Sequence, residues 1–282
     1  MRGFRAALEL VSPSQLVGFE ASIPKRSWTD IGGYSALISR IRQTLALIQS
    51  PLSNHQALGI SPPRGILLHG ASGCGKTLIA HAIANSTGLS VLEARPFELL
   101  SMYLGDTEAN IRSLFKTARQ MAPCIVLMDE LDVLATKRET DSTASDGAGG
   151  LNERTLSTLL NEMDGVQDRK GVLIVGCTSR LGAVDEAIIR PGRFDLLLHV
   201  DYPTRADRRD ILRILTADGK YSVNESEVDL DRIADMTDGF TGADLDAILR
   251  DAAVSTLRRD LTAQFINNDA ILNAINDWYE AN

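Results

Sequence analysis

Short runs of apolar residues alternate with helical spacings along the first two thirds of the chain. Strands buried in a sheet are predicted at 65–69, 90–93, 124–128, 171–177 and 196–200. One helix is predicted before the first strand, at 37–48, and others between the strands, at 78–85, 96–100, 108–120 and 154–163. Because strands that alternate with helices form parallel sheets, the pattern predicts an α/β fold with a parallel sheet flanked by helices.

From Thr204 onward the pattern is helical, with breaks near Gly219 and at 239–242. The chain is therefore predicted to contain an N-terminal linker at 1–27, an α/β domain at 28–201 and a smaller helical domain at 202–282. The segment 141–150 is rich in Ser, Gly, Ala and Asp and is expected to be a mobile loop.

The stretch Gly70–Thr77 reads G-x-x-x-x-G-K-T and lies between a predicted strand and a predicted helix, as a phosphate-binding loop requires. Its glycines let main-chain N–H groups turn toward a phosphate, and the helix start adds its positive dipole end. Lys76 is expected to reach the β- and γ-phosphates, and the Thr77 hydroxyl to bind Mg²⁺. The nucleotide-binding residues predicted here are Gly70, Ser72, Gly73, Cys74, Gly75, Lys76, Thr77 and Leu78.

An acidic pair, Asp129 and Glu130, follows the apolar run at 124–128. Ligands of α/β folds bind at the carboxyl ends of the strands, so the pair is well placed for chemistry on a phosphate. We expect Asp129 to hold the Mg²⁺ through water and Glu130 to polarise the attacking water. Without the phosphate loop, the pair would be as well explained as a solvated strand end.

Composition narrows the class of protein. The chain has 282 residues and a formal net charge of −8, which disfavours a general nucleic-acid-binding surface. Its three cysteines form no C-x-x-C pair, which favours a reducing compartment. No apolar run reaches the roughly 18 residues that span a bilayer, so we expect no membrane insertion. A cytoplasmic location is predicted, with a nuclear or peroxisome-associated one as alternatives.

Together these motifs resemble the AAA family of ATPases. The resemblance rests on Gly70–Thr77, on Leu127–Glu130, on Ile189–Asp195, on Asp30–Gly33 and on Thr241–Leu245, and it covers nearly the whole chain. It implies an ATP-hydrolysing α/β domain with a helical lid. It also implies a hexameric ring, of one or several kinds of subunit, that pulls protein substrates through a central pore with the help of adaptor proteins.

The resemblance implies roles for further residues. Ile31 and Gly32 match the turn that holds adenine, and Gly242 and Ala243 match the lid position that closes over the nucleotide. Arg190 and Arg193 match the arginine fingers offered to the ATP of a neighbouring subunit. Tyr103 matches the aromatic residue of the first pore loop, which grips an extended substrate chain.

The sequence departs from the family pattern at the end of the fourth predicted strand. Ser179 stands where the family usually has Asn, and a hydroxyl lacks the two donors of an amide. The departure bears on hydrolysis more than on binding, and the same Thr-Ser-Arg form is found in the peroxisomal peroxin-1 ATPases. Leu215 stands where relatives often carry His, so apolar contacts to the base are expected.

Residues 4–20 resemble the connector that precedes the second ATPase module of two-module AAA proteins, such as valosin-containing protein and its ribosome-maturation and peroxisomal relatives. The chain is therefore interpreted as such a second module. Cys74, beside a predicted helix start, is expected to have a lowered thiol pKa and to be protected from alkylation by ATP.

Three functions remain open from the sequence. The first is an ATP-driven motor that unfolds or remodels proteins, which the intact Lys76, Asp129 and Glu130 favour. The second is a structural module that binds ATP but hydrolyses it weakly, which Ser179 favours. The third is a nucleic-acid motor, against which the acidic charge balance counts.

Overall fold

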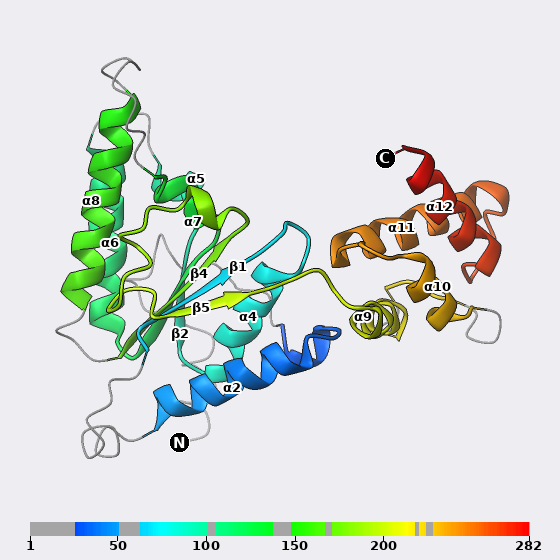
Figure 1. Ribbon diagram of the computed structural model, residues 1–282, viewed down its shortest axis with the longest axis horizontal. Helices are drawn as coiled ribbons and strands as arrows, with labels where there is room; N and C mark the ends of the chain where they lie inside the picture. The colour runs from blue at the N-terminus through cyan, green and yellow to red at the C-terminus, as the bar shows by residue number, and fades with distance from the viewer. Residues whose placement is uncertain are drawn as a thin grey trace, which may run out of the picture. The chain divides into compact units, whose positions relative to one another are not determined.

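The structure is a computed structural model that describes residues 26–50, 63–100, 105–137, 148–166, 171–217, 220–223 and 228–281. The chain divides into two compact units, and their helices and strands are labelled in Figure 1. One unit contains Pro62–Leu68 and Thr87–Leu197, and the other contains Arg26–Ser61, His69–Ser86 and Leu198–Asn282. The predicted connector at 4–20 and Tyr103 lie outside the described residues. The predicted domain boundaries at 27/28 and 201/202 stay predictions.

The centre of the fold is a five-stranded sheet with the order β2-β3-β4-β1-β5. Its strands are β1 (Gly65–His69), β2 (Ser90–Ala94), β3 (Cys124–Met128), β4 (Val172–Thr178) and β5 (Leu196–His199). β3 pairs in parallel with both of its neighbours, and Val126 lies opposite Leu92 on one side and Ile174 on the other. Every residue of β3 and β4 is buried, as a strand covered on both faces requires.

Helices cover the sheet within the first unit. They are α5 (Pro96–Leu99), α6 (Asp106–Met121), α7 (Leu131–Leu134), α8 (Ala148–Val166) and the 3-10 helix η3 (Leu181–Ala183). The amphipathic helix α6 contacts β2, β3 and α8, and buries Ile111, Leu114 and Phe115. These side chains join Val126 and Phe194 in one apolar core.

The second unit carries the remaining helices. They are the 3-10 helix η2 (Trp28–Asp30), α2 (Ser35–Gln49), α4 (Lys76–Thr87), α9 (Arg205–Ala217), α10 (Leu230–Met236), α11 (Gly242–Arg259) and α12 (Asn268–Ala281). α11 contacts both α9 and α12, and α10 contacts α9. Leu212, Phe240 and Leu249 belong to the core that these four helices share. A capping box formed by Thr241 and Asp244 starts α11.

The predicted helices and strands are confirmed, with shifts at their ends. The 3-10 helix η2, which begins at Trp28 and is capped by Ser27 and Asp30, was not among the predicted elements. The segment 141–150 was expected to be a loop to its end, but α8 already begins at Ala148. The four-residue helix α7 was missed because one turn leaves no periodic pattern. The tail also breaks at 260–267, where Asp260 caps a turn through Thr262.

Substitution of Phe240 tests the core of the second unit. Phe240 is buried, and its ring centroid lies 4.1 Å from that of Trp278 and 5.4 Å from that of Tyr279. Because Phe240→Ala leaves a cavity in a packed core, it is expected to lower the free energy of unfolding by about 3–5 kcal/mol. Urea titration followed by tryptophan fluorescence measures this, since Trp28 and Trp278 both lie in this unit.

The control for this prediction is Leu261→Ala. Leu261 is 88% exposed, so its truncation should change the free energy of unfolding by less than about 0.5 kcal/mol. Equal losses for the two variants would contradict the packing role of Phe240.

Candidate functional site

The loop between β1 and α4 consists of residues 70–75, and its glycines adopt backbone conformations that other residues rarely adopt. Gly70, Gly73 and Gly75 all have positive φ, at 148°, 79° and 86°. Gly70 also has no room for a side chain, because a Cβ there would lie 2.0 Å from the Val200 carbonyl oxygen. This position therefore needs glycine for both its conformation and its packing.

The loop closes around the side chain of Lys76, the first residue of α4. Its ammonium donates hydrogen bonds to the carbonyl oxygens of Gly70 at 2.9 Å and Ala71 at 2.7 Å, and Lys76 is 8% exposed. Thr77 lies in the same first helical turn and is exposed. A buried cation and a helix N-terminus thus occur together, and both favour an anion.

A cavity of about 260 Å³ lies beside this loop, within the second unit. It brings together eight of the residues predicted to bind the nucleotide: Ile31, Gly32, Gly73, Cys74, Gly75, Leu78, Gly242 and Ala243. Sequence reasoning missed five further wall residues: Tyr34, Ile79, Ile211, Ile214 and Asp246. Leu215 also lines the cavity, so an apolar side chain stands where His is usual.

Close main-chain contacts hold the walls of this cavity together. A Cβ at Gly32 would lie 2.5 Å from the Ile211 nitrogen, so glycine lets the turn at 31–33 approach α9. The Ala243 N–H donates to the Gly73 carbonyl at 3.1 Å, which joins the start of α11 to the phosphate loop. Tyr34 N–H donates to Asp207 at 2.7 Å. The turn, the loop and the lid helices are therefore tied by direct contacts.

The thiol of Cys74 does not behave as its position in the loop suggested. Cys74 is 2% exposed, and burial raises its thiol pKa, although Lys76 and a hydrogen bond with Tyr34 partly oppose that shift. The expected lowering of the pKa is therefore wrong. Desolvation of the thiolate outweighs the field of the helix start, because the sulfur points into the protein rather than toward solvent.

The acidic pair lies in the first unit, directly after β3. The Glu130 N–H donates to Asp129 Oδ1 at 3.0 Å, and Glu130 has the left-handed φ of 48°, which is rare for a residue other than glycine. This sharp turn leaves Glu130 exposed at the start of α7, while Asp129 is half-buried. Ser179 is exposed directly after β4 in the same unit.

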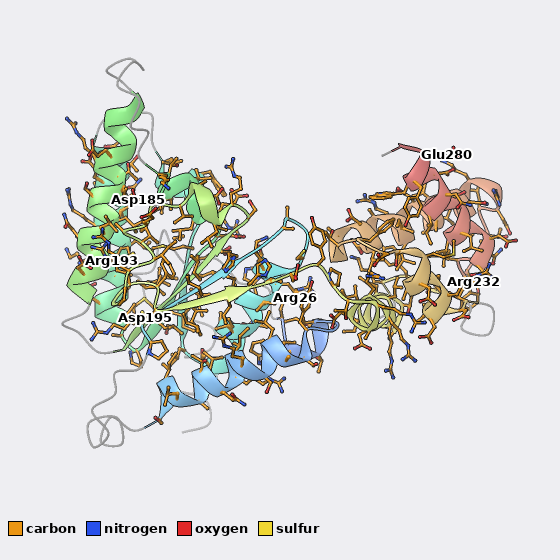
Figure 2. All side chains as sticks on the ribbon, viewed as in Figure 1. Arg26, Asp185, Arg193, Asp195, Arg232 and Glu280 are labelled. Carbon is orange, nitrogen blue, oxygen red and sulfur yellow. The ribbon has the colours of Figure 1, made fainter. Side chains whose placement is uncertain are left out.

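The two predicted arginine fingers differ in their surroundings. Arg193, which Figure 2 labels beside α8, is held within its own chain by two hydrogen bonds to Asp164 of that helix, at 2.8 Å and 2.7 Å, and by a third to the Ala187 carbonyl. The guanidinium lowers the pKa of the Asp164 carboxyl. Arg190 is exposed and makes no ion pair with any residue in the described ranges. Only Arg190 is therefore free of this intramolecular bond.

Two kinds of site are missing among the described residues. No group of three or more His, Cys, Asp or Glu side chains there could by itself hold a metal ion. None of the helices in that part of the chain combines the length and the apolar character needed to cross a membrane.

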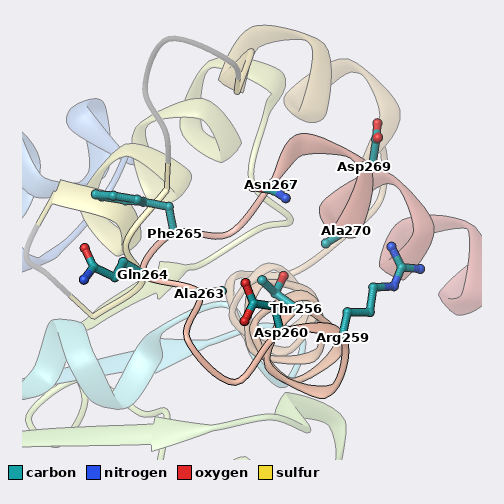
Figure 3. Close-up of a pocket in the computed structure, with 9 residues that line it drawn as sticks. All are labelled: Thr256, Arg259, Asp260, Ala263, Gln264, Phe265, Asn267, Asp269 and Ala270. Atoms are coloured by element: carbon teal, nitrogen blue, oxygen red, sulfur yellow. The ribbon is translucent and has the colours of Figure 1, made fainter.

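A second cavity, of about 370 Å³, opens between the end of α11 and the start of α12 (Figure 3). Its walls include Arg259, Asp260 and Phe265. Asp260 is already bound by the amide and hydroxyl of Thr262, at 2.8 Å and 2.6 Å. The cavity therefore offers no unsatisfied carboxylate from this residue, and we assign it no function.

The fold and the loop geometry define a class: an α/β protein that binds a nucleotide phosphate and carries a helical lid. The family models give the same result. Residues 66–202 match the ATPase family associated with various cellular activities (AAA), and residues 227–274 match the AAA+ lid domain. The chain belongs to the AAA family of ATPases.

Curated relatives agree with this assignment. The chain is 41% identical to cell division control protein 48 homolog B of Arabidopsis thaliana over 94% of its length. It is 38% identical to ATPase family gene 2 protein homolog A of Homo sapiens and 39% identical to nuclear valosin-containing protein-like of Mus musculus, again over 94% of its length. It spans only 43%, 29% and 30% of these three proteins.

Alkylation tests the environment of Cys74. Because burial raises the thiol pKa, iodoacetamide should label Cys74 slowly at neutral pH. A free cysteine, whose pKa is about 8.5, is half ionised at that pH and approaches its maximum rate above it. Labelling of Cys74 should keep accelerating at pH values where a free cysteine has already levelled off. Mass spectrometry of the Cys74 peptide separates it from the two other buried cysteines. Saturating ATP should slow the reaction further, and a rate that levels off near neutral pH would contradict this account.

Proposed function

We propose that this chain hydrolyses ATP and is the motor module of a ring that unfolds or remodels proteins. The observation that carries the proposal is the cavity beside the phosphate loop, where eight predicted nucleotide-binding residues meet. Its size and apolar walls suit a base, and the adjoining loop with its buried lysine suits a polyphosphate.

Lys76 and Thr77 bind the phosphates in this proposal. The Lys76 ammonium exchanges its bonds to the Gly70 and Ala71 carbonyls for bonds to phosphate oxygens, which are stronger because both partners are charged. Ile31, Gly32 and the lid residues Gly242 and Ala243 enclose the base.

Mg²⁺ would be held by Thr77 and, through water, by Asp129. This donor set fits the ion, since Mg²⁺ keeps several waters and needs only one or two protein ligands beside the phosphates. The ion would neutralise charge on the β- and γ-phosphates.

Glu130 is proposed as the residue that orients and deprotonates the attacking water. Its exposed position at the tip of a left-handed turn leaves the carboxylate free to meet substrate. Ser179 would donate one hydrogen bond to the water or the γ-phosphate. Arg190 and Arg193 would stabilise the transition state of a neighbouring subunit.

A ring of six subunits, of one or more kinds, follows from shared sites of this type. Tyr103 is proposed to contact the substrate chain in the pore, and adaptor proteins would deliver substrates. A cytoplasmic location remains our proposal, and the nuclear name of the mouse relative keeps a nuclear one open.

A structural role in an AAA ring with weak hydrolysis is the second candidate. Ser179 favours it, because a short hydroxyl replaces the amide that usually contacts the water. The two candidates predict different effects of removing the catalytic base.

The substitution Glu130→Gln separates the two functions. Loss of the base is expected to lower kcat for ATP hydrolysis by roughly 10²–10⁴-fold and to leave nucleotide binding intact. Phosphate release and the binding of a fluorescent ATP analogue measure the two effects. Glu186→Gln is the matched control, since Glu186 is an exposed carboxylate in an exposed ion pair with Lys137. Equal activity of wild type and Glu130→Gln would favour the structural role.

Mixing two inactive variants tests whether sites are shared. Arg190→Ala removes an exposed cation without breaking an ion pair seen among the described residues, so the fold should survive. Each of Arg190→Ala and Glu130→Gln should be nearly inactive alone. In an equal mixture, about a quarter of the interfaces would combine an intact arginine with an intact base, and activity should return to that extent. A mixture as inactive as its parts would argue against a finger in trans.

A further inference from the structure

We propose that Asp132 is a positioning residue for ATP hydrolysis, whose buried carboxylate fixes the main chain on both sides of Ser179. The proposal rests on the proposed function, because Ser179 can act on the γ-phosphate or its water only if the chain hydrolyses ATP. None of the motifs quoted from the sequence includes Asp132, since the acidic motif ends at Glu130.

The carboxylate of Asp132 is held by the two residues that flank Ser179. Thr178 Oγ1 donates to Asp132 Oδ1 at 2.9 Å, and Arg180 Nε donates to Asp132 Oδ2 at 3.1 Å. A second guanidinium nitrogen of Arg180 also lies 3.1 Å from Oδ2. Both oxygens of one carboxylate are thereby committed to the segment that carries Ser179.

A third hydrogen bond closes the network into a ring. The Arg180 N–H donates to Thr178 Oγ1 at 3.1 Å, so the Thr178 hydroxyl accepts from the main chain while it donates to Asp132. Ser179 lies in sequence between two members of this ring, Thr178 and Arg180, and the three hydrogen bonds do not involve it. Its main chain is therefore held from both sides, while its exposed hydroxyl stays free to meet a ligand.

The same residue reaches back to the catalytic turn. Asp132 is the second residue of α7, which begins directly after the left-handed turn at Glu130. The ring thus links two short segments that leave neighbouring strands, β3 and β4, which pair in register up to Met128 and Gly176. The carboxylate belongs to the segment after β3 and is hydrogen-bonded to the segment after β4. A shift of one segment must therefore strain the other.

Burial argues for a specific role. The Asp132 side chain is 5% exposed, whereas that of Arg180 is 72% exposed. A buried carboxylate is costly unless it is fully paired, and an apolar residue would often serve stability as well. The buried charge of Asp132 is explained by its role, which is to hold Thr178 and Arg180, and so Ser179 between them, in a fixed position. Ser179 depends on that geometry because it has one donor rather than two.

The test compares Asp132→Asn and Thr178→Val with the conservative Thr178→Ser. Asp132→Asn and Thr178→Val should displace the Ser179 hydroxyl. A displacement of about 1 Å is enough to lower kcat by about 10- to 100-fold. KM for ATP and the affinity for nucleotide should change less than about twofold, because the phosphate loop is untouched. Thr178→Ser keeps the hydroxyl and should retain kcat. Glu186→Gln, which removes an exposed acid, is the control.

A background that lacks the Ser179 hydroxyl shows whether Asp132 acts through it. In Ser179→Ala, the further change Asp132→Asn should lower kcat by much less than it does in the wild type. An equal additional loss would overturn the proposal. A lower thermal midpoint and weaker nucleotide affinity with unchanged kcat would also overturn it, since they would mean a purely structural role.

If Asp132→Asn does not fold, Arg180→Ala tests the same ring from its solvent side. Its guanidinium is largely exposed, so millimolar guanidinium can enter the vacated place and should restore part of the lost kcat. No loss of kcat in Arg180→Ala and in Thr178→Val would refute the inference. The Glu130→Gln variant separates the two failures, because a loss of hydrolysis there alongside active Asp132 variants would leave the proposed function standing.

Discussion

The candidate site depends on one interaction: the hydrogen bonds of the buried Lys76 side chain to the carbonyl oxygens of the phosphate loop. Lys76 is almost fully buried, and its hydrogen bonds go to two main-chain carbonyl oxygens of the loop that it closes. Carbonyl dipoles compensate a buried charge less well than an anion does, so the loop is prepared for a phosphate. The positive φ angles of the loop glycines and the N-terminus of α4 also favour the binding of a phosphate.

Burial also decides the chemistry of neighbouring side chains. Cys74 follows the loop glycine Gly73, beside a helix start, a position that normally lowers a thiol pKa. Yet desolvation raises that pKa in this fold. The pKa of the Tyr34 phenol, in the same cavity, is raised by burial and by the charges around it. The cavity is thus an apolar compartment joined to a polar loop, an arrangement that suits a nucleotide, which has an apolar and a charged end.

Paired charges hold the segments of the first unit that carry the proposed catalytic residues. Asp164 binds Arg193, and Asp132 binds Arg180, each through a carboxylate that bridges elements distant in sequence. Such pairs contribute geometry more reliably than stability, because desolvation offsets much of their attraction. They have in common that each fixes a residue, Arg193 or Ser179, that the AAA resemblance connects with the γ-phosphate.

The sequence by itself determined the class of fold and the parts of the site. The apolar runs predicted all five strands, and the loop spacing identified Lys76 and Thr77, because these signals are local and depend on periodicity and on a contiguous motif. Only the tertiary structure decided which residues wall the cavity, why Gly32 must be glycine, and that the Cys74 thiol is desolvated. It also decided that Asp132 and Thr178, 46 positions apart, share a hydrogen bond. Contacts of this kind leave no trace in local pattern, since they depend on how strands β3 and β4 are brought together.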